Sequence, residues 1–256
     1  MSGFADYKDR VNRHFGFTSK EIKALLISII VIGFIVSFKD WVLTPEGALD
    51  ILITLKNIIN GIIVAALVLL IHETAWRLWA IWLGFNPESK IWWPGLITGV
   101  LLAFASNGNL WFIAAPAVFI SLHPTHRLGH FRYGLNMNAN GWICIFGISS
   151  VILFAVLLKI LLFYLPANYL LHKALAVCIW FTIINMLPIP PLDGTRIFFM
   201  AGGPLIYIFY FSLVIGFAIL LSVSISALWQ IWLLLLGALV IGVIGWLSYL
   251  NMVHNK

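Results

Sequence analysis

Two carboxylates lie in apolar sequence, where a charged group needs a partner. Of the 9 Asp and Glu residues, Glu73 and Asp193 are embedded in long hydrophobic runs. On membrane-insertion scales a carboxylate at the centre of an apolar helix costs about 2.5–3.5 kcal/mol, so such a residue indicates a functional site by default. The alternative interpretation is that each acid only forms an ion pair with a nearby arginine, Arg77 or Arg196.

Glu73 directly follows a histidine, and this pair begins a known metal-binding pattern. His72-Glu73 matches the first half of H-E-x-x-H, in which two histidines one helical turn apart bind zinc and the glutamate activates the metal-bound water. The position of the second histidine is occupied by Trp76. Its indole offers an N–H donor and no lone pair for a metal.

Asp193 ends a proline-rich stretch that begins after Asn185. The sequence reads Asn-Met-Leu-Pro-Ile-Pro-Pro-Leu-Asp-Gly, with Pro188 and Pro190 among three prolines in four residues. Such a run cannot continue a helix, because proline lacks an N–H and restricts the residue before it. Unwound chain at membrane depth is tolerated only where it is buried in protein or lines a watery cavity. The stretch therefore predicts a metal or substrate site.

The composition excludes a soluble globular protein. Hydrophobic residues make up 62% of the 256 and charged residues 9%, whereas a soluble domain carries about 25% charged residues. We therefore expect an integral membrane protein in the lipid bilayer. The net charge of +6 is explained by basic loops retained in the cytoplasm, and no nucleic-acid partner is expected.

The apolar runs predict an all-α polytopic membrane protein. A spanning helix needs roughly 20 apolar residues. Six candidate helices have suitable length: residues 22–38, 58–85, 143–165, 169–187, 204–223 and 225–250. Residues 92–122 hold two shorter apolar pieces, which predict either two further crossings or a re-entrant hairpin.

The basic residues orient these spans. With the amino terminus in the cytoplasm, 11 Lys and Arg fall on the inner side and 4 on the outer side, as expected when both termini are cytoplasmic. Helix 58–85, which carries His72 and Glu73, and helix 169–187, which precedes Asp193, then both run from outside to inside, and all three residues lie toward the cytoplasm. They are expected to meet although 193 − 72 = 121 positions separate them. We expect the cell membrane as the location.

Together the two motifs resemble the site-2 protease family of intramembrane zinc metalloproteases. Ala115–Val118, Asn140–Gly141 and Phe146–Gly147 resemble weaker stretches of that family. The resemblance covers about residues 58–200. It implies zinc held by two histidines and an aspartate, a glutamate as general base, and an asparagine that holds the substrate.

Carried over by motif, these roles fall on a small set of residues: His72 and Asp193 as metal ligands, Glu73 as catalytic base, and Asn185, Pro188 and Pro190 in substrate binding. The role of the second histidine falls on Trp76, which cannot bind metal. The chain then divides into four parts: a cytoplasmic leader (residues 1–21), a signal-anchor helix with an outer loop (22–57), a site-2-protease-like core (58–200) and two C-terminal transmembrane helices (201–256).

Trp76 leaves three interpretations open. A replacement ligand could come from His123, His126 or His130, although an interfacial loop explains these histidines better. The chain could be a pseudoprotease that binds client transmembrane helices, or Trp76 could be an introduced change that silences the enzyme.

The leading prediction is regulated intramembrane proteolysis, the zinc-dependent cleavage of transmembrane segments of client membrane proteins. The pseudoprotease is the alternative. A transporter or proton pathway is third, because no second proline run indicates related halves.

Overall fold

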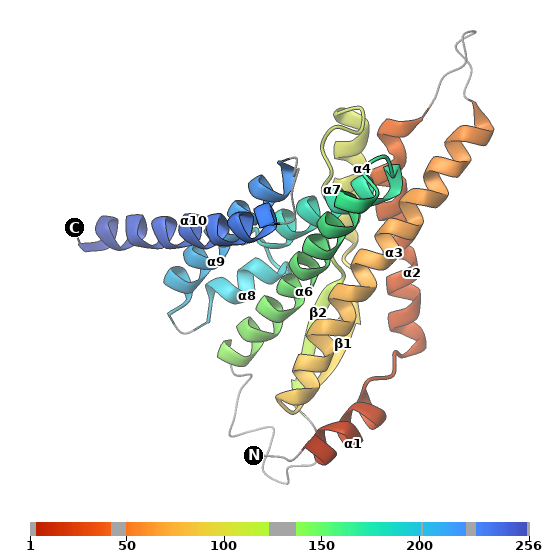
Figure 1. The fold of residues 1–256 in the computed structure, drawn as a ribbon. Coiled ribbons are helices and arrows are strands. Elements are labelled where there is room, and N and C mark those ends of the chain that lie inside the picture. Colours follow the sequence, from red (N-terminus) through yellow and green to blue (C-terminus); the bar gives the residue numbers. More distant parts are fainter. Residues whose placement is uncertain (1–3, 42–49, 123–136, 201, 224–228, 255–256) are drawn as a thin grey trace.

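The protein is mostly helical, with one short two-stranded sheet (Figure 1). The computed structural model describes residues 4–41, 50–122, 137–200, 202–223 and 229–254. Its elements are, in chain order, α1 (Phe4–His14), α2 (Ser19–Ser37), a 3-10 turn (Phe38–Asp40), α3 (Ile51–Trp82), β1 (Phe85–Lys90), α4 (Trp93–Ala105), β2 (Ala117–Leu122), α6 (Met137–Tyr164), α7 (Tyr169–Asn185), α8 (Asp193–Phe198), α9 (Gly203–Ser222) and α10 (Trp229–His254).

The long helix α3 is the central element, with α2 on one side and α6 on the other (Figure 1). Its first turn is capped by the Asp50 side chain, which accepts a hydrogen bond from the backbone N–H of Ile53 at 3.2 Å. Helices α2, α3, α6 and α7 share one apolar core, which includes Ile32, Val36, Val64, Val68, Leu69, Val151 and Phe181. In a membrane this packing holds the helices together through van der Waals contact.

Helices α2 and α3 approach closely at two glycines. A Cβ atom at Gly33 would lie 2.7 Å from the Ile62 Cα, and one at Gly61 would lie 2.5 Å from the Gly33 carbonyl oxygen. Both distances are too short for a side chain against backbone atoms. Small residues at such positions are typical of helix contacts in membranes, because they let the backbones approach.

Four of the helices in the described ranges are long and apolar enough to cross a membrane: α2 with the turn after it, α3, α6 and α9. Helix α7 is apolar but shorter, with 17 residues. Helix α10 packs on α9 and extends away from α3 and α6 (Figure 1). The six spans and the cytoplasmic side of both termini therefore stay predictions.

The prediction of an all-α protein is wrong at residues 92–122. The first apolar piece is helix α4, but the second is an extended chain that ends in β2. Strand β2 pairs antiparallel with β1, from Phe85 opposite Leu122 to Lys90 opposite Ala117. Pro116 precedes the strand and disfavours a helix there. The side chains of β1 alternate between buried and exposed, as in a half-buried strand.

Lys159 is one of the 4 basic residues that the predicted topology assigns to the outer side, and its side chain lies inside α6 and is buried. Its ammonium donates hydrogen bonds to the carbonyl oxygens of Leu221 and Val223, both at 2.6 Å. These carbonyls lie at the end of α9, where the helix cannot pair them itself. Lys159 thus caps α9 from the neighbouring helix.

The glycine contact predicts how substitutions affect stability. Gly33→Ala should lower the melting temperature in detergent by the equivalent of about 1–3 kcal/mol, because overpacking against Ile62 outweighs the better helix propensity of alanine. Gly16→Ala is the control, since nothing lies within 4 Å of a Cβ there. Equal melting temperatures for the two variants would contradict the close contact.

Candidate functional site

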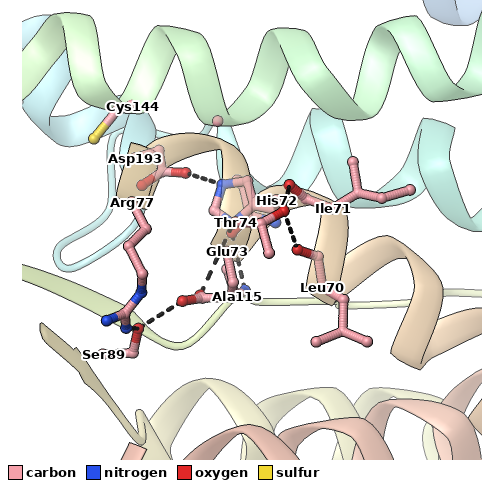
Figure 2. A network of polar contacts seen from close by, with 12 residues as sticks. Leu70, Ile71, His72, Glu73, Thr74, Arg77, Ser89, Ala115, Cys144 and Asp193 are labelled. Carbon is pink, nitrogen blue, oxygen red and sulfur yellow. Dashed lines mark hydrogen bonds and ion pairs between the residues drawn. The ribbon is translucent and has the colours of Figure 1, made fainter. Parts of the chain in front are cut away.

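His72 of α3 and Asp193 at the start of α8 meet inside the helix bundle, as the sequence analysis expects (Figure 2). The His72 Nε2 lies 2.8 Å from the Asp193 Oδ2, and the two side chains are 0% and 4% exposed. A buried carboxylate requires such a partner. Two residues far apart in the chain therefore form one polar centre.

The proline run places Asp193 at this centre. Helix α7 ends at Asn185, and the chain turns back between Met186 and Leu192. At Gly194 a Cβ atom would lie 2.1 Å from the Met186 carbonyl oxygen, so only glycine lets α8 begin so close to the end of α7. Pro188 and Pro190 lie exposed on this turn.

Glu73 lies beside His72 but has a different partner. Its Oε2 accepts a hydrogen bond of 2.5 Å from the hydroxyl of Ser89 on β1 (Figure 2). Its Oε1 lies 4.0 Å from the His72 Nδ1, and both atoms are without a hydrogen-bond partner among the described residues. One carboxylate oxygen thus remains free at the centre.

A buried ion pair between α3 and α2 also holds strand β1 in place. The Arg77 Nη2 donates to the Glu21 Oε1 at 2.5 Å, and the two side chains are 1% and 3% exposed. The backbone N–H of Ser89 also donates to the Glu21 Oε1, at 3.0 Å. Ser89 therefore connects Glu73 of α3 to Glu21 of α2.

The arginines near the two acids have other main partners. Arg77 binds Glu21, and Arg196 donates to the carbonyl oxygen of Val118 on β2. The partners of Glu73 and Asp193 are Ser89 and His72. A simple pairing of each acid with its neighbouring arginine does not describe the site.

Asn185 holds an extended segment of the chain beside the centre. Its side-chain amide donates to the Ile113 carbonyl oxygen at 3.1 Å, and its carbonyl oxygen accepts from the Ala115 N–H at 3.0 Å. A further hydrogen bond goes to the carbonyl oxygen of Phe181, at 2.8 Å. Asn185 is 0% exposed, and its amide is engaged within the chain itself.

Trp76 lies one helical turn after His72 and is 1% exposed. Its ring belongs to an apolar cluster that joins α3 to both strands and to α6: Ala80, Phe85, Val118, Ile120 and Ile143. Its Nε1 has no hydrogen-bond partner among the described residues. On α6, a Cβ atom at Gly147 would lie 2.9 Å from the His72 Nε2 and 3.2 Å from the Trp76 Cβ.

The described side chains do not fit a three-ligand zinc site. Catalytic zinc usually has three protein ligands. Within the described ranges, no group of three His, Cys, Asp or Glu side chains could hold a metal ion. His72 and Asp193 supply two donors, and Trp76 has no lone pair to offer. His123, His126 and His130 lie outside the described residues.

Glu21 and Ser89 are site residues that the sequence analysis missed. Glu21 was placed in a polar leader, but it belongs to α2 and is 2% exposed. The sequence carried one signal of this position, because Thr18 and Glu21 form a capping box at the helix start. No local sequence pattern indicates Ser89, since the position of this residue depends on the pairing of β1 with β2.

Comparison with known proteins gives one informative similarity. The chain is 29% identical over 187 residues to a protein of Methanocaldococcus jannaschii named "Putative zinc metalloprotease MJ0611", covering 72% of this chain and 85% of that protein. No family model matches the chain, and no solved structure matches it. The similarity and the apolar helices together indicate a membrane protein related to a metalloprotease.

The buried ion pair predicts a large effect of its removal. Glu21→Gln should destabilise the protein by about 3–5 kcal/mol, because it leaves the Arg77 charge buried without its counter-ion. Asp6→Asn is the matched control, since it removes an exposed pair with Arg10 and should change stability little. Unfolding in detergent measures both.

A double variant tests the pair itself. Glu21→Gln with Arg77→Met removes both charges and should recover part of the lost stability. If the double variant is as unstable as the sum of the single variants, the two charges do not stabilise one another.

Proposed function

We propose that this protein is a site-2-protease-type membrane protein that binds transmembrane segments of client membrane proteins without cleaving them. The observation that carries the site-2-protease-type class is the contact of His72 with Asp193 at 2.8 Å, across 121 positions of the chain. This contact unites the two motifs on which the family resemblance rests. The similarity to a protein named as a zinc metalloprotease supports the same class.

The surroundings of the centre favour recognition of an unwound segment. A client helix that unwinds in the membrane exposes backbone N–H and C=O groups, which must be paired there. Asn185 pairs such groups of the extended segment at Ile113 and Ala115. Strand β2 continues this extended segment, and its Phe119 is 44% exposed.

Trp76 argues against cleavage, because zinc hydrolysis needs a ligand at its position. The residues of the buried centre then serve to stabilise the structure and to bind client segments.

Cleavage of client segments is the second candidate, and one observation favours it. The Oε1 of Glu73 is without a partner in the described part of the chain and lies 4.0 Å from His72, where a general base is expected by the resemblance. This candidate requires a third metal ligand from outside the described residues.

Site-specific photo-crosslinking tests the binding function. A benzophenone amino acid replaces Phe119 on β2, and in the control it replaces Leu153, which is 66% exposed on α6. The probes are two single-span peptides in nanodiscs, one with Asn-Pro at its centre and one with an uninterrupted leucine helix. The Asn-Pro peptide should crosslink several-fold more from position 119, and both peptides equally from position 153.

Equal crosslinking of both peptides from position 119 would contradict recognition of an unwound segment. Mass spectrometry of the peptides decides between the two candidates. Intact peptides are expected. A zinc-dependent cut that disappears in the Glu73→Gln variant would establish cleavage instead.

A further inference from the structure

We propose that the buried centre works without a metal ion, as a junction in which Trp76 replaces a metal ligand and fastens the two-stranded sheet of β1 and β2 to α3. This sheet, whose strands are joined through α4, is called the hairpin below. The inference rests on the proposed function, because the family resemblance is what assigns a ligand position to residue 76. It goes further by stating the chemical nature of the centre.

The packing of Trp76 is the first argument. A ligand at this position would point its donor atom at the metal beside His72. The indole instead belongs to an apolar cluster between α3, α6 and both strands, together with Phe85, Val118 and Ile143. Burying a tryptophan yields a large packing area, which here outweighs the cost of an indole N–H that has no partner among the described residues.

The polar contacts of the hairpin are the second argument. Ser89 and Val118 lie opposite one another in the two strands. Ser89 is bound by Glu73 and Glu21, while the carbonyl oxygen of Val118 is bound by Arg196. This single pair of residues thus connects the hairpin to α3, α2 and α8.

The two arguments support the same conclusion. One oxygen of Glu73 is engaged by Ser89, and the ligand position is occupied by a ring in the same apolar cluster as residues of both strands. A metal ion would need a third donor at a place that Trp76 and the glycine of α6, Gly147, surround closely. The centre is therefore stabilised by hydrogen bonds and packing, and its stability does not depend on zinc.

Zinc content and thermal stability of the full chain test this inference. The protein is purified in detergent, dialysed against a weak chelator, and compared with and without added zinc. The wild type should hold almost no zinc, and its melting temperature should not change on adding zinc or chelator. Trp76→His should bind about one zinc per chain, the stoichiometry of a three-ligand site, and its melting temperature should become sensitive to the chelator.

Two variants serve as controls. Trp76→Phe keeps an aromatic ring and loses no hydrogen bond, so it should fold and remain zinc-free, with a lower melting temperature because the smaller ring leaves part of the space unfilled. Asp193→Asn in the Trp76→His background should abolish the gained zinc, because it removes a metal ligand. If Trp76→His does not fold, the zinc content of the wild type and its response to the chelator still decide the question.

Two results would overturn the inference. One is a wild type that keeps about one zinc per chain and loses it on Asp193→Asn; replacing His123, His126 and His130 by alanine would then identify the third ligand. The other is a folded Trp76→His variant that binds no zinc, which would show that residue 76 is not a ligand position. Crosslinking of the Asn-Pro peptide in the same preparations separates failure of this inference from failure of the binding function.

Discussion

The structure depends on the burial of charged groups in an apolar bundle. Glu21, Glu73, Arg77 and Asp193 are each at most 3% exposed, in a chain with 9% charged residues. A buried charge is costly unless it is paired and hydrogen-bonded. The partners come from α2, α3, α8 and the hairpin, so the pairing of these charges ties the four elements together. The polar contacts specify the position of the hairpin, and the apolar contacts stabilise it.

Local signals in the sequence predicted the centre of the site. Glu73 was recognisable as an acid in an apolar run, and the proline run identified Asp193 as the end of an unwound stretch. Their meeting at His72 followed from the direction of the helices. Each of these steps depends on neighbouring residues or on the membrane, and none of the steps requires knowledge of long-range packing.

The hairpin and Glu21 were not predictable in the same way. Strand β2 has six residues in an apolar region, which a short helix would also accept. Its strand conformation depends on pairing with β1, about 30 positions earlier in the chain. The burial of Glu21 depends on Arg77, 56 positions away. A single sequence does not show such pairings, because the local sequence around each partner is equally compatible with an ordinary loop or leader residue.

Trp76 shows how one helical position can serve two different kinds of site. Residues four apart lie on one face of a helix, so the side chain at position 76 projects toward the same region as His72 whatever its type. A histidine there directs a lone pair at a metal, and the tryptophan presents a flat apolar surface to the hairpin. The ligand position and the hairpin contact therefore compete for one side chain. Trp76 belongs to one apolar cluster with Phe85 and Val118, so its burial contributes packing at the position that the resemblance assigns to a metal ligand. Asn185 holds the extended segment at Ile113 and Ala115 through hydrogen bonds that involve neither His72 nor Asp193, so these contacts do not depend on the side chain at position 76.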